Sequence, residues 1–237
     1  MSRMPVEVKF YILLFFISAC LGWCMEVICK LIQLHRFINR GFLIGPCCPI
    51  YGFGAVSVTL LLSRFADTPP AVFGLAILVC GTLEYLTSVI MEKLFHARWW
   101  DYSGSRFHLN GRVCAETLLP FGLLGLMMVY FIKPALFQLF SCLPGVVLST
   151  LCIVLCSLFL IDTCISVWAL VKIRRGAERV EGDSTEAITA SVRTLLQKES
   201  AIVRRALHAF PDARIYNTRL LKRLREKKLA RNAGGNE

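Results

Sequence analysis

The chain has 237 residues, 56% of them hydrophobic and 18% charged, with a formal net charge of +11 at pH 7. This apolar fraction exceeds the roughly 45–50% of soluble globular domains, and long apolar runs fill the chain up to Leu170 and then stop. A soluble core does not need several nearly uncharged runs of about 20 residues, whereas helices of that length cross a bilayer. Length and composition therefore exclude a soluble globular domain and predict an all-α membrane protein.

Five apolar runs predict about five transmembrane helices, and the second of them is expected to be a broken helix. The runs cover residues 10–28, 42–62, 71–91, 113–132 and 145–171. The second run is rich in residues that interrupt a regular helix, namely Gly41, Gly45, Pro46, Pro49, Gly52 and Gly54. Non-helical backbone at membrane depth persists only when it is buried in protein or lines a wet cavity. This segment is therefore either a packed kink or part of a substrate site.

The loops between these runs alternate in positive charge. Residues 30–41 contain three Lys and Arg, residues 63–70 one, residues 93–112 four and residues 133–144 one. Because cytoplasmic loops carry the excess of Lys and Arg, the pattern places the first loop, the third loop and the C-terminus in the cytoplasm. Treating the second run as a re-entrant loop would put several basic residues outside together. We therefore favour five spans in a multi-pass protein of the cell membrane.

Residues 172–237 form a basic tail, which we predict to be a cytoplasmic helical part that follows a transmembrane domain over residues 1–171. The tail holds 16 Lys and Arg against 8 Asp and Glu. After a linker that includes Gly176, its pattern predicts one helix over 185–209 and a second, amphipathic helix over 217–231. The second helix is suited either to a membrane surface or partner protein, or to a hairpin with the first.

Four acidic side chains fall within the apolar runs, where a charged group is costly and needs a reason. They are Glu26, Glu84, Glu116 and Asp162. With the topology above, all four lie in the cytoplasmic half of the membrane, and scattered structural acids would not be expected to share a depth. We predict that Glu84 and Glu116, with Arg98 and Arg112 of the third loop, form one connected polar site with the broken segment over 45–52. Glu26 and Tyr51 are further candidates for this site.

The third loop carries an unusual set of aromatic and charged residues around positions 96–103 and 110–112. One interpretation is an aromatic belt at the membrane interface. The other is that its arginines pair with the membrane acids and hold them charged. On the second interpretation, the candidate substrate-binding residues are Glu26, Tyr51, Glu84, Arg98, Trp99, Trp100, Asp101, Asn110, Arg112 and Glu116.

Several motifs of catalysis and metal binding are absent from the sequence. It has no Gly-x-x-x-x-Gly-Lys-Ser/Thr, no Gly-x-Ser-x-Gly and no His-Glu-x-x-His. The eleven cysteines lie in or beside the apolar runs, and none forms a zinc pattern with histidine. We expect no catalytic residue, no cofactor, no metal and no specific nucleic acid, although spacing alone does not exclude a pair of catalytic acids.

Further motifs point to a family. They are the Gly-Pro-x-x-Pro-Ile-Tyr-Gly-Phe-Gly stretch over 45–54, Glu84-Tyr85, Met91-Glu92-Lys93-Leu94-Phe95, the Arg-Trp-Trp-Asp-Tyr stretch over 98–102, and Asn110-Gly111-Arg112 followed by Glu116. Over about residues 15–134 the chain resembles the CmpB-like (type IV) family of ABC-transporter permeases. The resemblance implies a membrane subunit that a separate ATPase subunit drives, with an unknown substrate. It also implies a homo-oligomer, because five spans are few for a permease.

Three functions are therefore open. The first is a transporter subunit with a polar site facing the cytoplasm. The second is a membrane enzyme that acts on a lipid at the inner leaflet, with Glu84 or Glu116 as acid or base and Arg98 and Arg112 holding a headgroup phosphate. The third is a non-catalytic scaffold in the bilayer whose tail recruits a partner.

Overall fold

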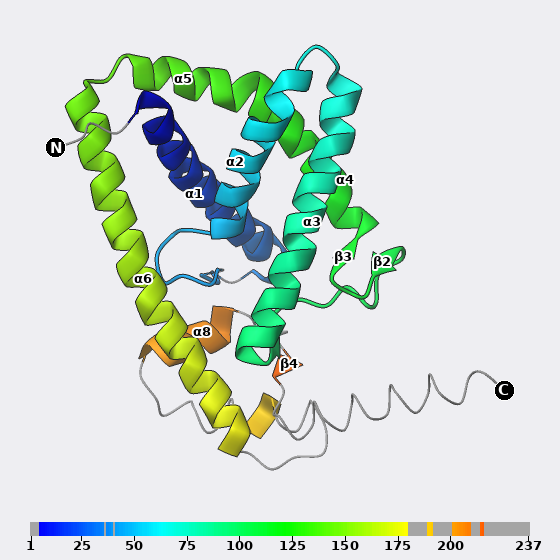
Figure 1. Ribbon diagram of the computed structural model, residues 1–237. Coiled ribbons are helices and arrows are strands. Elements are labelled where there is room, and N and C mark those ends of the chain that lie inside the picture. Colours follow the sequence, from blue (N-terminus) through cyan, green and yellow to red (C-terminus); the bar gives the residue numbers. More distant parts are fainter. Residues whose placement is uncertain are drawn as a thin grey trace. The chain divides into compact units, whose positions relative to one another are not determined.

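The computed structural model (Figure 1) describes residues 5–35, 37–39, 41–179, 189–191, 201–209 and 214–215. Its helices are α1 (Val6–Leu34), α2 (Pro49–Leu62), α3 (Pro69–Phe95), α4 (Ala115–Met127), α5 (Lys133–Ser141), α6 (Gly145–Arg179) and α8 (Ala201–Ala209). A 3-10 helix, η1 (Ser63–Phe65), follows α2, and a π-helix, η2 (Met128–Ile132), joins α4 to α5. The predicted all-α class is confirmed.

Four of the described helices are long and apolar enough to cross a membrane, judged by length and composition. They cover Val6–Gln33, Pro69–Phe95, Ala115–Ser141 and Gly145–Arg175. The second predicted run contributes only a shorter apolar helix, Pro49–Phe65, because residues 41–48 are not helical. Proline suits the first turn of a helix, where its missing N–H is not needed, so α2 begins at Pro49. The fifth span remains a prediction.

The predicted topology has a direct test, because Thr68 and Ser103 flank α3 on opposite sides. In a variant without native cysteines, we expect a Thr68→Cys protein to react with a membrane-impermeant maleimide added outside intact cells. A Ser103→Cys protein should react only after the cells are opened, because the Lys- and Arg-rich third loop is placed inside. Labelling of the Ser103→Cys protein in intact cells would contradict the topology.

The chain divides into two compact units that interleave along the sequence. The first unit is Met1–Thr87 with Tyr102–Ile165, and the second is Ser88–Asp101 with Ser166–Glu237. In the first unit α1 and α2 lie side by side (Figure 1). Its main core joins four helices through the buried residues Phe10, Leu14, Ala55, Val58, Leu62, Val72, Ala76, Met128 and Val129. A smaller core of Leu13, Leu148 and Cys152 attaches α6 to α1.

Two segments that the sequence predicts to be loops are helical, so these two predictions are wrong. The predicted loop over 133–144 contains α5, whose Phe137 and Phe140 rings meet the Phe10 ring edge-on at 5.9 Å. Through these ring contacts, α5 packs across the start of α1 (Figure 1). The predicted linker at Gly176 is also helical, because α6 continues to Arg179. Of the predicted helix over 185–209, the structure describes only residues 189–191 and α8. The predicted helix over 217–231 lies outside the described residues.

Two very short strand pairs occur among the described residues. β2 (His108–Leu109) pairs antiparallel with β3 (Val113–Cys114) in the first unit, and β1 (Ala97–Arg98) pairs antiparallel with β4 (Arg214–Ile215) in the second. The β2–β3 hairpin turns at Asn110 and Gly111, both with positive φ angles of 52° and 65°. Two residues of positive φ are what a type I′ hairpin turn requires, and Asn-Gly is its preferred sequence.

Candidate functional site

Glu84 is buried in the first unit, within the span α3, with only 7% of its surface exposed. Its carboxylate lies between two hydroxyl groups. Tyr102 donates to Oε1 at 3.2 Å, and Thr117 in the first turn of α4 lies 3.4 Å from Oε2. Among the described residues, the partners of Glu84 are therefore hydroxyls and not the arginines that the sequence suggested.

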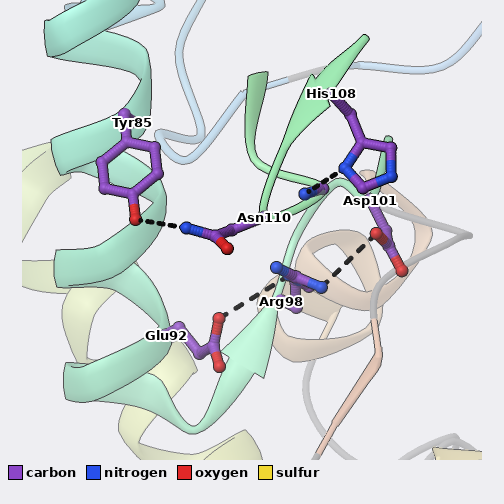
Figure 2. A network of polar contacts seen from close by, with 7 residues as sticks. Tyr85, Glu92, Arg98, Asp101, His108 and Asn110 are labelled. Atoms are coloured by element: carbon purple, nitrogen blue, oxygen red, sulfur yellow. Dashed lines mark hydrogen bonds and ion pairs between the residues drawn. The ribbon is translucent and has the colours of Figure 1, made fainter. Parts of the chain in front are cut away.

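The hairpin of β2 and β3 brings Tyr102 to Glu84. The backbone N–H of Tyr102 donates to the carbonyl of Gly111 in the turn at 2.8 Å. Next to Gly111, the amide Nδ2 of Asn110 donates to the hydroxyl of Tyr85 at 3.0 Å (Figure 2). The guanidinium carbon of Arg112 lies 5.8 Å from the centre of the Tyr85 ring, which is a cation–π distance. The hairpin is thus fixed to α3 one residue after Glu84.

A second carboxylate in the first unit, Glu26 of α1, also binds a hydroxyl group. The hydroxyl of Tyr51, in the first turn of α2, donates to Oε1 of Glu26 at 2.8 Å. Burial raises the pKa of Tyr102, the adjacent Glu84 carboxylate raises it further, and Glu26 makes a smaller contribution in the same direction. We define these two hydrogen-bonded groups, Glu26 with Tyr51 and Glu84 with Tyr102 and Thr117, together as the polar cluster.

The non-helical residues 41–48, which precede α2, are held by polar contacts with other parts of the first unit. Asp162 of α6 accepts hydrogen bonds from the backbone N–H groups of Ile44 and Gly45, both at 2.8 Å. The side chain of Asn39 donates to the carbonyl of Ile44 at 3.1 Å and accepts from the indole of Trp23 at 2.7 Å. Backbone groups that a helix would satisfy internally are therefore satisfied here by side chains.

The second unit contains a separate set of charged contacts. The guanidinium of Arg98 lies 3.7 Å from Glu92 and 3.4 Å from Asp101, and Figure 2 shows both ion pairs. At the ends of α3 and α6, Arg174 donates to the carbonyl of Leu94 at 3.0 Å. A basic side chain on the last carbonyls of a helix is a favourable cap. Arg98 is thus paired with two acids of its own unit.

The comparison with protein families adds an independent finding. The chain matches the family described as "putative ABC-transporter type IV" over residues 13–167, which is more than half of its length. The chain belongs to this family. With its apolar helices, membership makes it a membrane transporter-like protein that lies in a lipid bilayer, as the sequence motifs suggested. The matched range contains the whole polar cluster and ends before the tail. No curated protein and no solved structure matches the chain.

The predicted site residues fall into two groups. The first unit contains Glu26, Tyr51, Glu84, Asn110, Arg112 and Glu116, and the second contains Arg98, Trp99, Trp100 and Asp101. The predicted pairing of Arg112 with Glu84 or Glu116 is not present among the described residues, where neither acid has an arginine partner and Arg112 lies over Tyr85. Glu116 is exposed and has no hydrogen bond within the described part of the chain.

Sequence reasoning did not place Tyr102 and Thr117 in the site. Tyr102 was visible only as an aromatic residue of the third loop, and Thr117 gave no signal of its own. One signal could have helped: Asn110-Gly111 between short apolar stretches predicts a hairpin, which would have brought Tyr102 back toward the membrane. Among the described residues, no group of three or more His, Cys, Asp or Glu is arranged to hold a metal ion.

Proposed function

We propose that this protein is the membrane permease subunit of an ABC-type transporter and that the polar cluster recognises the transported substrate. The observation that supports this most is the burial of Glu84 within the apolar helix α3. A charged side chain within a membrane span costs up to about 3 kcal/mol, and less nearer the interface, so a purely structural position favours an apolar residue. An acid that is buried there with two hydroxyl partners is better explained by a ligand or a proton than by packing.

The hydrogen bonds around Glu84 leave part of its carboxylate unused. An ionised carboxylate offers about four acceptor sites. Tyr102 fills one of them, but Thr117 has a single hydroxyl proton and also lies 2.9 Å from the carbonyl of Cys114. Thr117 therefore donates either to Glu84 or to that carbonyl, and the carboxylate keeps capacity for at least two further donors. A substrate that brings N–H or O–H donors would complete the site.

The need for a separate ATPase subunit follows from the sequence and the family. The chain lacks the P-loop motif with which ABC-type ATPases bind nucleotide, while the family to which it belongs is a transporter family. The energy for transport would then come from a partner that carries the P-loop. The cytoplasmic third loop and basic tail are the parts of the chain placed to meet it, given the topology predicted above.

The proposal is tested with the full chain, tagged and purified in mild detergent, then reconstituted in lipid vesicles. We expect a P-loop ATPase to co-purify in a fixed ratio and to hydrolyse ATP several-fold faster when the chain is present than when it is removed. The inactive control is the same complex with the Lys of the partner's P-loop replaced. A chain that purifies without any ATPase and chemically converts a co-purifying lipid would contradict the proposal and favour a membrane enzyme.

A further inference from the structure

Asp162 has contacts that neither its residue type nor its place in an apolar run suggests. It lies on α6, and its two carboxylate oxygens accept backbone hydrogen bonds from consecutive residues, Oδ1 from Ile44 and Oδ2 from Gly45, both at 2.8 Å. Hydrogen bonds to an ionised acceptor are roughly twice as strong as those between neutral groups. One side chain thereby satisfies two amides that have no helical partner.

The segment that Asp162 holds is shaped for this contact. A Cβ atom at position 45 would lie 3.0 Å from Oδ2 of Asp162, which is tighter than ordinary contacts, so glycine there lets the carboxylate approach. The carbonyl of Ile44 is held from the other side by Asn39. Three residues later, the backbone N–H of Cys48 donates to the carbonyl of Ala19 in α1 at 3.0 Å. The path of residues 44–48 is thus fixed from α6 and from α1.

These contacts lead directly to the polar cluster. Cys48 is the N-cap of α2, and Tyr51 in its first turn donates to Glu26. A displacement of residues 44–48 would therefore displace the start of α2 and with it the Tyr51 hydroxyl. We propose that Asp162 is a positioning residue: by binding the Ile44 and Gly45 amides, it fixes the start of α2 and links α6 to the polar cluster. This inference rests on the proposed function of that cluster.

The structural part of this proposal is tested by amide hydrogen exchange of the full chain in lipid nanodiscs. Asn at position 162 keeps one acceptor oxygen, but its NH2 group faces an N–H donor, so Asp162→Asn loses one of the two bonds. We expect exchange in residues 43–45 to become about tenfold faster, while amides of α3 are unchanged. Asp67→Asn, at an exposed acid in the turn before α3, is the matched control and should change nothing. Unchanged exchange in Asp162→Asn would overturn the proposal.

The functional part is tested by complementation, in which the growth of cells that depend on the protein reports its transport activity. We expect Asp162→Asn to reduce transport about tenfold at an unchanged level of folded protein, and Asp162→Glu, which keeps both acceptor oxygens, to restore part of it. If Asp162→Asn speeds amide exchange but transports at the full rate, the positioning role is overturned. The role is also overturned if Asp162→Glu loses as much transport activity as Asp162→Asn. If Glu84→Gln transports normally, the function proposed for the cluster fails, whereas the exchange result for Asp162 stands by itself.

Discussion

Replacing Glu84 with Gln is expected to reduce transport at least about tenfold while the amount of folded protein in the membrane stays the same. Gln has nearly the same volume, and its carbonyl oxygen still accepts a hydrogen bond from Tyr102, so the packing of α3 is preserved. It cannot ionise, and it offers fewer acceptor sites to a ligand. A hydrogen bond to a charged group contributes about 1.5–3 kcal/mol, and each 1.4 kcal/mol corresponds to a tenfold change in binding.

Glu116→Gln is the matched control for this experiment. It makes the same chemical change one residue before Thr117, but at an exposed position that has no hydrogen bond within the described residues. We expect it to keep at least half of the activity. Transport is compared with the quantity of folded protein, measured by fluorescence-detected size exclusion in detergent. If Glu84→Gln lowers both quantities equally, the acid is structural; if it lowers neither, the polar cluster has no role in recognition.

Removing the hydroxyl partners one at a time tests the contribution of each oxygen of the Glu84 carboxylate. Tyr102→Phe deletes the donor at Oε1, whereas Thr117→Val deletes the shared hydroxyl near Oε2 without a large change in volume. Because Thr117 also serves the Cys114 carbonyl, its loss affects the start of α4 as well. A smaller transport defect in both variants than in Glu84→Gln would identify the carboxylate, and not its hydroxyl partners, as the group that matters.

The sequence predicted the membrane helices and the acids, but not which acids meet which partners. Burial of Glu84 was foreseeable from its cost in lipid, because a charge in an apolar run must be accommodated somewhere. Its partners were not foreseeable, since Tyr102 and Thr117 reach it from segments 18 and 33 residues away. Such contacts depend on how a loop folds back, and hydropathy contains no information on that. Only the Asn110-Gly111 turn marked where the loop reverses.

The membrane depth of an acidic residue was also an incomplete guide to its contacts. The sequence predicts the same depth for Asp162 and Glu84, because both interrupt apolar runs in the same half of the membrane. The structure gives them different contacts, since Asp162 binds two backbone amides and Glu84 binds side-chain hydroxyls. The difference comes from residues 41–48, whose unpaired amides need an acceptor. Their lack of helix was predicted from glycine and proline, so an acid to serve them could have been expected, although not which one.

The start of α2 allows a second test with a large effect, because Gly52 lies against α1 with no space for a side chain. A Cβ atom there would lie 2.6 Å from Cδ2 of Phe15 and 2.8 Å from the backbone oxygen of Phe15. The backbone cannot move without shifting α1. The ring is also restrained, since it makes edge-on contacts with Phe53 at 5.0 Å and Phe159 at 5.6 Å between ring centres. Gly52→Ala therefore forces α1 and α2 apart.

We expect Gly52→Ala to lower the free energy of unfolding by about 3 kcal/mol, at the upper end of the usual cost of overpacking. For a chain of this size that corresponds to a fall in Tm of roughly 6–12 °C, measured by thermal aggregation in detergent. Gly54→Ala is the control on the same helix, because its nearest neighbour is Sγ of Cys80 at an ordinary 3.8 Å. Alanine is the better helix former by up to about 1 kcal/mol, so this variant should keep or raise the Tm. Equal Tm values for the two variants would show that the close approach of α1 and α2 at Gly52, and with it the placement of Tyr51 beside Glu26, does not hold.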